Sequence, residues 1–462
     1  MRGFFKEVKK MFASLNFIYV FLPLCLLFYY LFKKNNAVLL IFSLIFYGME
    51  GWQFLLLMLA TILTAFINGK LLEKYKNKIH FIASCLMCTG PLIYFKYTDF
   101  FIKNFNSIFN TNVNLLKLLL PVGISFYTFQ LMTYIIDVYR GKIESEKNII
   151  NLALYITFFP QLVAGPIVTY VDMKNQLKER KHSLELFTEG VFMFLIGFGK
   201  KILLANQLGE FCSVYHASTD KTILLTWAYA ISYSLQVYFD FAGYSEMAIG
   251  LGKMFGFQLP RNFNYPFIAC SIKDFWKRWH ITLSTFFKDY VYIPLGGSRC
   301  KPLRRMFNLF VVWFLTGFWH GADWVFIIWG LYFFVLLCFE KYVLKDKVNV
   351  FTRIITPILA IISFVIFGST SFANFSETFL GLFSGNLTST LTAHHLSNYG
   401  CLILIAIIGA TPLPKFLFNK LKETKLKPII PVLQEIFIIL VFLLSTAYLV
   451  DGSFNPFLYF RF

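Results

Sequence analysis

The sequence predicts an all-α polytopic membrane protein with about eleven transmembrane helices plus re-entrant or interfacial helices. Of its 462 residues, 57% are hydrophobic and only 15% are charged, whereas soluble domains carry roughly 25% charged residues. Aromatic residues reach 20%, including 58 Phe, a composition that suits lipid-facing surfaces and interfacial belts. Apolar segments recur along the whole chain, so we expect residues 1–462 to form a single integral membrane domain.

The apolar segments differ in length, and not all of them are long enough to span a bilayer. The first, 15–32, is followed by no small-residue cleavage pattern, and we interpret it as a membrane anchor. Segments 37–48 and 398–412 fall short of the ~20 residues that cross ~30 Å of hydrocarbon, so they are tilted, re-entrant or longer than their apolar cores. The other predicted segments are 52–68, 79–95, 114–137, 150–170, 186–204, 222–242, 307–325, 326–343, 354–372 and 429–450.

The charge of the chain predicts its topology. A formal net charge of +19 indicates short basic loops on the cytoplasmic side. Stretches 208–220 and 376–400 contain no Lys or Arg, so we expect them on the outer side. We see no basic soluble face of the kind that binds nucleic acid. The stretches expected in the cytoplasm are 70–78, 140–147, 174–181, 273–305 and 415–427.

Residues 260–305 are polar by the standard of this chain, yet crowded with aromatic side chains. Ser271 and Asp274 have the spacing of a capping box that opens a helix. A helix that is aromatic on one face and polar on the other lies in an interface or lines a wet cavity. Pro294, Gly296 and Gly297 would end it. The expected aromatic face holds Phe275, Trp276, Trp279, Leu283, Phe286, Phe287 and Tyr290, and the polar face holds Lys277, His280, Ser284 and Lys288.

His320 is the strongest candidate functional residue, because 307–334 contains no Lys, no Arg and a single Asp. An ionisable residue inside an apolar segment is a functional-site hypothesis by default. Burial disfavours the imidazolium and leaves a neutral ring that accepts a proton at pH 7, as a general base on a hydroxyl requires. Gly321 would allow close approach of a substrate, and Trp319 would wall the pocket.

Other interpretations stay open from the residues alone. His320 could simply bond a neighbouring helix, and His280 could be an interfacial polar residue. A metal site formed by these two histidines lacks a third ligand, so we predict none. Asp240 and Glu246 could pair with Arg261 or with the basic helix that follows it. Alternatively, the chain is a glycan or lipid exporter whose intramembrane His and Asp relay protons; such a transporter should show matching broken helices in two halves, which we do not find.

The run from Asp274 to Arg299 resembles the signature of the membrane-bound O-acyltransferases, in particular the branch that acetylates bacterial polysaccharides such as alginate. Leu315–Ala322 is similar to the second motif block of that family. Further similar runs are 121–130, 159–166, 238–245 and 454–460, so the resemblance covers nearly the whole chain. The run Tyr292–Gly297 favours the polysaccharide-acetylating branch over the D-alanine-transferring one. Lys277 and Phe287 stand where the family pattern has Arg and Trp.

The resemblance implies a fold, a reaction and a set of residues. The fold is a ring of tilted helices around a thinned membrane centre with a cytoplasmic funnel. The catalytic histidine of the family corresponds to His320, and its other signature position to His280. The donor would be acetyl-CoA or another acyl thioester, with no bound cofactor and no metal. Residues expected to bind substrate are Trp319, Lys277, Arg278 and Ser284.

The resemblance also implies a location and partners. The protein would lie in the bacterial cytoplasmic (inner) membrane as a multi-pass protein within the lipid bilayer. The acceptor would be either the surface polysaccharide itself or an extracytoplasmic SGNH-type acetyltransferase that relays the acetyl group to it, and the family precedent favours the partner. The polysaccharide would be alginate-like, cellulose or peptidoglycan.

Overall fold

The computed structural model describes residues 12–425 and 427–452 of the chain, and every regular element within them is a helix. These residues fall into two compact units. Unit 1 comprises Met1–Val191 and Ala248–Pro260, and unit 2 comprises Phe192–Met247 and Arg261–Phe462. The motif run 454–460 and residue 426 of the last basic stretch lie outside the described residues.

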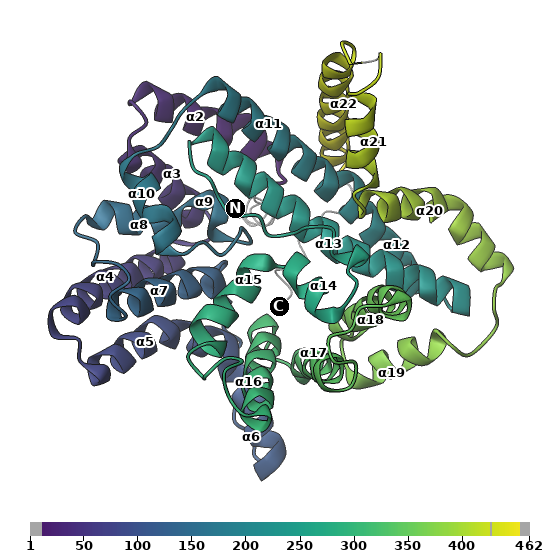
Figure 1. Ribbon diagram of the computed structural model, residues 1–462, viewed down its shortest axis with the longest axis horizontal. Coiled ribbons are helices and arrows are strands. Elements are labelled where there is room, and N and C mark those ends of the chain that lie inside the picture. Colours follow the sequence, from purple (N-terminus) through teal and green to yellow (C-terminus); the bar gives the residue numbers. More distant parts are fainter. Residues whose placement is uncertain (1–11, 426, 453–462) are drawn as a thin grey trace. The chain divides into compact units, whose positions relative to one another are not determined.

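Unit 1 is built mostly from short and medium helices, and some of these helices begin at asparagine caps. The side chains of Asn35, Asn77 and Asn148 each accept a backbone N–H at the start of a helix, which satisfies donors that the first turn leaves without an intrahelical partner. Its helices (Figure 1) are η2 (Phe17–Phe21), α2 (Leu22–Leu31), α3 (Asn36–Gly48), α4 (Trp52–Tyr75), α5 (Lys78–Leu92), η3 (Ile93–Tyr97), α6 (Thr98–Phe109), α7 (Ile124–Tyr139), α8 (Ile149–Thr157), α9 (Phe159–Leu162) and α10 (Tyr170–Lys178).

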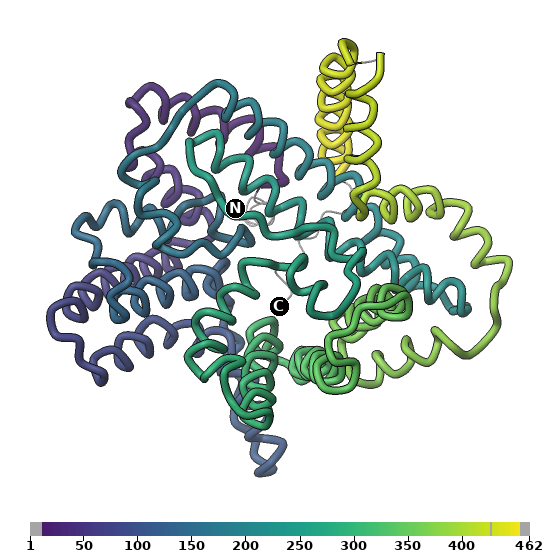
Figure 2. Tube along the Cα trace, viewed as in Figure 1, coloured from purple at the N-terminus to yellow at the C-terminus, as the bar shows by residue number. Residues whose placement is uncertain are grey.

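Unit 2 combines long helices with several very short ones. Helices α11 (Leu184–Gly199) and α13 (Ile223–Met254) each run from one unit into the other, and both can be followed in Figure 2. The other elements are η4 (Lys200–Ala205), α12 (Asn206–Ala217), η5 (Pro266–Ile268), α14 (Ile272–Arg278), α15 (Ile281–Phe287), η6 (Lys288–Tyr292), α16 (Pro302–His320), α17 (Trp324–Tyr342), α18 (Val350–Gly368), α19 (Phe372–Gly381), α20 (Thr390–Gly409), α21 (Leu413–Leu421) and α22 (Ile430–Val450).

Seven helices among the described residues are long and apolar enough to cross a membrane. This confirms the predicted all-α polytopic membrane fold. The expected number of about eleven also counted shorter apolar helices, of which Phe17–Leu31 and Asn36–Gly48 are examples. The seven are Trp52–Tyr75, Lys78–Phe109, Leu184–Ala217, Trp324–Tyr342, Val350–Gly368, Thr390–Gly409 and Ile430–Val450.

Two predicted apolar segments are not continuous helices. In 114–137, helix α7 begins only at Ile124, after Pro121 and a left-handed Gly123. The preceding chain is held instead by Asp99, whose carboxylate accepts the backbone N–H groups of Leu116 and Lys117 at 2.8 and 2.9 Å. These side-chain bonds compete with the bonds of a helix.

The segment predicted at 150–170 breaks at Phe158, which has an extended ψ of 103° between α8 and α9. The next residue, Phe159, donates its N–H to the Ser43 hydroxyl at 3.3 Å, and Pro160 has no N–H to continue the helix. Segment 150–170 is as hydrophobic as a membrane-spanning helix. Its backbone, however, forms α8, then a break at Phe158, then the single turn α9.

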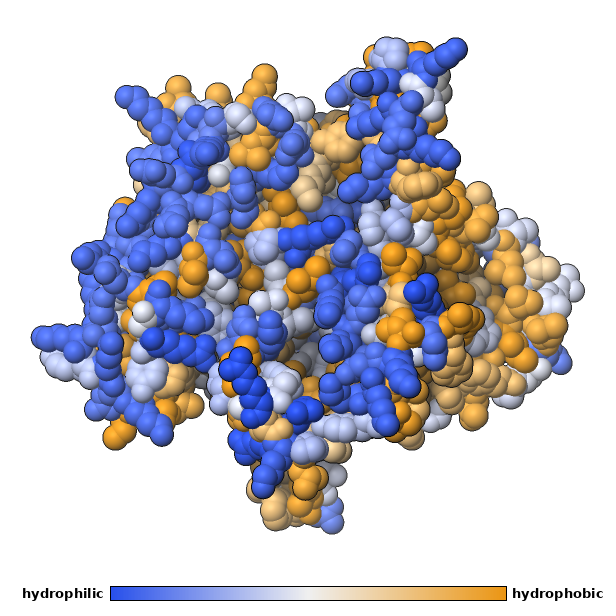
Figure 3. All heavy atoms as spheres, viewed as in Figure 1, coloured by the Kyte–Doolittle hydropathy of each residue, from blue (hydrophilic) through white to orange (hydrophobic). Residues whose placement is uncertain are grey.

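Polar and apolar side chains separate within each unit. In unit 1, hydrophilic side chains gather over α4, α8 and α10 on the face seen in Figure 3. In unit 2, hydrophobic side chains cover most of the part that holds α19 and α20. Exposed leucines such as Leu404 and isoleucines such as Ile405 fit contact with lipid rather than water.

Candidate active site

His320 is the last residue of α16 and is held by very close packing of α16 against α17, which lie side by side in unit 2 (Figure 1). A Cβ on Gly317 would stand 2.3 Å from the Phe326 carbonyl oxygen, and one on Gly330 would stand 2.3 Å from that of Trp313. Only glycine permits this approach. His320 itself is only 6% exposed, so the crossing fixes a buried imidazole at the end of a helix.

His280 lies at a sharp break in the segment for which we predicted one helix. Helix α14 ends at Arg278, α15 begins at Ile281, and His280 has a left-handed φ of 44°. That conformation costs roughly 1–2 kcal/mol for a residue other than glycine. The prediction of a single amphipathic helix is therefore wrong, and His280 is fully buried rather than on the polar face of such a helix.

Asn262 holds His280 in this conformation. Its backbone carbonyl accepts the Ile281 N–H at 2.9 Å, and its side-chain Oδ1 lies 3.2 Å from the His280 Nδ1. Oδ1 also accepts the backbone N–H and the hydroxyl of Thr282 at 3.2 and 2.9 Å. These bonds are the compensation that a strained buried residue requires.

The same contacts fix the tautomer of His280. A backbone N–H can only donate, so the Asn262 atom that faces the Thr282 N–H is the carbonyl oxygen, and that oxygen can only accept. His280 Nδ1 therefore carries the proton, and Nε2 carries the lone pair. Burial lowers the pKa of His280 to about 3, so the ring is neutral at physiological pH. His280 Nε2 is buried and accepts no hydrogen bond from the described residues.

One aromatic cluster in unit 2 contains both histidines. The His280 ring centroid lies 4.6 Å from that of Phe241 and 6.1 Å from that of Trp319. Trp319 in turn lies 4.7 Å from His320, and Trp329 contacts the other side of His320 at 4.8 Å. Since edge-on aromatic contacts of this kind fix ring orientation, the cluster places both imidazoles against one indole.

The short helix α14 is anchored from α17. The Glu340 carboxylate, only 6% exposed, accepts the backbone N–H groups of Ile272 and Lys273 at 2.6 and 3.3 Å. Ser271 accepts the N–H of Asp274 at 3.1 Å, which confirms the serine half of the predicted capping box. An anion at a helix N-terminus is favourable, so α17 supports both the histidine of α16 and the entry into α14.

The residues predicted to bind substrate take different positions. Trp319 is buried between the two histidines. Lys277 is exposed on α14, and Ser284 is half-buried on α15. Arg278 donates from Nε to Asp274 at 3.0 Å and from Nη1 to the Asn264 carbonyl at 3.4 Å. The structure thus brings His280, Trp319 and His320 into one aromatic cluster, of which Lys277, Arg278 and Ser284 are not members. Within 12–425 and 427–452, no group of three His, Cys, Asp or Glu residues is arranged to hold a metal ion.

Asp240 and Glu246 pair with partners other than the predicted ones. Lys201 meets Asp240 at 2.6 Å with both side chains buried, and Lys200 meets Glu246 at 2.6 Å. Arg261, the partner we expected, donates to the Phe263 carbonyl instead. Both lysines belong to η4, and both acidic partners belong to α13. These ion pairs are contacts between helices, and the Asp240 carboxylate that a proton relay would need is already engaged by an ammonium group.

Asn262, Phe241, Trp329 and Phe367 belong to the site but were not predicted from the sequence. The Phe367 and His320 ring centroids lie 5.3 Å apart. Asn262 stands 18 positions before His280, with no helical or strand spacing between them. Asn262 lies within 260–305, the stretch that the sequence marks as polar by the standard of this chain.

Comparison with known proteins identifies the family to which this arrangement belongs. Residues 144–373, which include both histidines, match the family model of the membrane-bound O-acyltransferases (MBOAT). The probable alginate O-acetylase AlgI of Azotobacter vinelandii is 34% identical over 500 aligned positions, covering 98% of this chain and 100% of that protein. The chain belongs to the membrane-bound O-acyltransferase family.

Other relatives of this acyltransferase are named for alginate or for peptidoglycan. The probable alginate O-acetylase AlgI of Pseudomonas aeruginosa is 38% identical over 366 residues, which is 77% of this chain and 70% of that protein. The peptidoglycan O-acetyltransferase of Helicobacter pylori is 38% identical over 354 residues, covering 68% of this chain and 67% of that protein. The predicted family, enzyme class and multi-pass membrane character are confirmed.

Proposed function

We propose that this acyltransferase moves an acetyl group from a cytoplasmic activated donor across the membrane for O-acetylation of an extracytoplasmic polysaccharide, with His320 as general base. The observation that carries the proposal is the placement of His280 and His320 around Trp319 in one buried aromatic cluster. It is supported by the end-to-end similarity to a probable alginate O-acetylase.

The reaction needs a base and a good leaving group but no further reagent. His320 takes the proton of the attacking hydroxyl while the hydroxyl oxygen forms a bond to the thioester carbonyl carbon. The carbon–sulfur bond then breaks, and the thiolate leaves with the proton that the imidazolium returns. One ester and one thiol result, and the histidine ends in its starting state.

His280 is the second catalytic residue in this proposal. Its neutral Nε2 carries a lone pair within the cluster, so it accepts a hydrogen bond from the hydroxyl nucleophile or from a water that orients it. Because Asn262 fixes the ring on the opposite side, the acceptor atom cannot exchange roles with Nδ1. Loss of His280 should lower the rate strongly even while His320 remains.

The donor and the acceptor extend the proposal to partners. Acetyl-CoA or another acyl thioester supplies the acetyl group from the cytoplasm. Lys277 and Arg278 attract its phosphates, and Ser284 lies with them on the donor side. The acceptor is an extracytoplasmic SGNH-type acetyltransferase that relays the acetyl group to an alginate-like polymer, cellulose or peptidoglycan. The acyltransferase itself would lie in the bacterial cytoplasmic membrane.

Exchange of His320 tests this function. His320→Ala should remove ester-linked acetate from the surface polysaccharide while the protein stays in the membrane, since the base is lost and the fold is not. His395→Ala, a histidine on α20, is the matched control and should leave acetate unchanged. Acetate released by mild alkali from purified envelope polymer is the measurement, with a membrane immunoblot beside it. Normal acetate in the His320→Ala strain would refute the role of this residue.

A further inference from the structure

Two adjoining cavities in unit 1 have opposite character. One, of about 650 Å³, is apolar and lies between the end of α2 and the start of α11, with Leu27, Leu31 and Phe187 in its wall. The other, of about 680 Å³, is polar and carries four cationic side chains, Lys33, Lys34, Lys178 and Arg180, with one carboxylate, Glu179. Lys34 and His182 line both cavities.

The cations of the polar cavity are held in place by the backbone and by packing. Lys33 and Lys34 both adopt left-handed conformations, with φ of 55° and 62°. Arg180 donates to the Lys34 carbonyl at 3.1 Å, and its guanidinium lies 4.4 Å from the Phe257 ring centroid. The Arg180 Nε is buried and has no hydrogen-bond acceptor among the described residues. A donor left buried in this way requires a partner.

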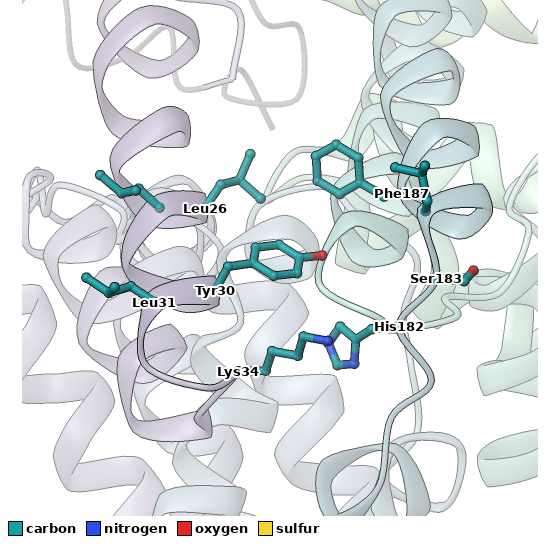
Figure 4. A pocket seen from close by; sticks show the side chains of 9 residues that line it. Leu26, Tyr30, Leu31, Lys34, His182, Ser183 and Phe187 are labelled. Atoms are coloured by element: carbon teal, nitrogen blue, oxygen red, sulfur yellow. The ribbon is translucent and has the colours of Figure 1, made fainter.

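The cations of this cavity form no ion pairs with the described part of the chain. Among residues 12–425 and 427–452, none of the ion pairs involves Lys33, Lys34 or Arg180. Burial, followed by the charges of Lys34 and Arg180, lowers the pKa of His182, as a positive field does. Figure 4 shows Lys34 and His182 pointing toward one another at the mouth of the apolar cavity.

The apolar cavity begins where the cations end. Leu31 is 67% exposed and Leu184 is 81% exposed, and Tyr30 is fixed by a 2.8 Å bond from its hydroxyl to the Met254 carbonyl. Exposed leucines of this kind suit contact with lipid chains better than contact with water. A group of cations thus adjoins an exposed apolar surface, where α2 ends and α11 begins.

We propose that this pair of cavities binds an anionic phospholipid, with the headgroup phosphate on Lys34 and Arg180 and an acyl chain along Leu27, Leu31 and Phe187. Basic pockets beside transmembrane helices bind anionic headgroups, at about 1 kcal/mol for each cation near the membrane surface. The ligand must carry both an anionic headgroup and an acyl chain, because the polar cavity complements only the headgroup and the apolar cavity only the chain. The site lies in unit 1 and does not depend on the proposed chemistry of the two histidines.

Lipid retention by the purified full-length protein tests the site. The protein in detergent is mixed with phosphatidylglycerol or phosphatidylcholine carrying identical chains, and bound lipid is counted by native mass spectrometry. We expect phosphatidylglycerol to be retained preferentially, and Lys34→Gln to weaken its binding about fivefold, which corresponds to one lost cation. Lys34→Arg should keep the preference.

Lys76→Gln is the matched control, because Lys76 is also a left-handed lysine that ends an apolar helix of unit 1; it should bind phosphatidylglycerol like the wild type. His320→Ala should do the same, which separates this site from the acyl-transfer proposal. Equal retention of the two lipids by the wild type, or no effect of Lys34→Gln, would overturn the proposal. Binding of coenzyme A that Lys34→Gln abolishes, without a lipid preference, would instead assign the cavity to a soluble phosphate ligand.

Discussion

In the pair formed by Asn262 and His280, the amide oxygen of Asn262 determines which imidazole nitrogen of His280 is basic. We expect Asn262→Leu to lower acetyl transfer about 100-fold, the scale of a misplacement of about 1 Å in an active site. Asn262→Asp keeps an acceptor for Thr282 and for His280 Nδ1, but its negative charge raises the pKa of His280. If the neutral ring is required, the acid limb of the pH–rate profile moves to higher pH in Asn262→Asp.

The shift of the acid limb to higher pH in Asn262→Asp follows from the neutral state of His280 in the wild type. The pKa of His280 is lowered to about 3 by burial, so protonation of this ring does not limit the wild-type enzyme between pH 5 and 8. An Asn262→Asp enzyme whose profile matches the wild type would show that Asn262 acts only in folding. Steady-state acetyl transfer from pH 5 to 9, normalised to folded protein in membranes, distinguishes the two outcomes.

At the residue scale, sequence reasoning reached the histidines but not what holds them. His280 and His320 stand out because polar residues in apolar surroundings are rare and need a reason. The contact of Asn262 with His280 cannot be predicted in the same way, since it depends on the left-handed turn at His280. No local spacing of residues predicts that turn, and the sequence pattern predicted a continuous helix through His280 instead.

At the element scale, hydrophobicity predicted where helices lie better than where they break. Segments 37–48 and 429–450 correspond to α3 and α22 almost residue by residue. The breaks at Phe158 and before Ile124 depend on a hydroxyl of Ser43 and a carboxylate of Asp99 that reach in from other helices. The chain is apolar on both sides of each break, so composition alone does not reveal the side chain from another helix that causes the break.

The crossing of α16 and α17 should be sensitive to a single methyl group. In Gly317→Ala the new Cβ would stand 2.3 Å from a backbone carbonyl, and relief of such overpacking costs about 1–3 kcal/mol. Because His320 lies one turn beyond on the same helix, we expect both a lower unfolding temperature and weaker acetyl transfer.

Gly400→Ala provides the comparison at this scale. Gly400 lies inside α20, and a Cβ there would meet no atom within 4 Å. Alanine favours a helix by up to about 1 kcal/mol over glycine, so this variant should unfold at the same temperature or slightly higher, with normal activity. Thermal unfolding of the two variants in one detergent is the measurement. Equal behaviour of Gly317→Ala and Gly400→Ala would contradict the proposed role of the close crossing.

At the scale of the whole molecule, the proposed acetyl transfer requires a donor and an acceptor on opposite sides of a membrane. The net charge of +19 is concentrated in loops that the positive-inside rule assigns to the cytoplasm. The stretch 376–400 contains no Lys or Arg and joins the end of α19 to the first half of α20. A donor on one side and an acceptor on the other fit this asymmetry.

Single cysteines report this topology directly. Glu144, in the basic stretch 140–147, and Ser384, in the stretch free of cations, are both exposed. In a Cys401→Ser background, which removes the exposed native thiol, Glu144→Cys should react with a membrane-impermeant maleimide only after the membrane is opened. Ser384→Cys should react in intact cells that lack an outer barrier. Labelling of both positions from the same side would refute the topology, and with it the separation of donor and acceptor that transmembrane acetyl transfer requires.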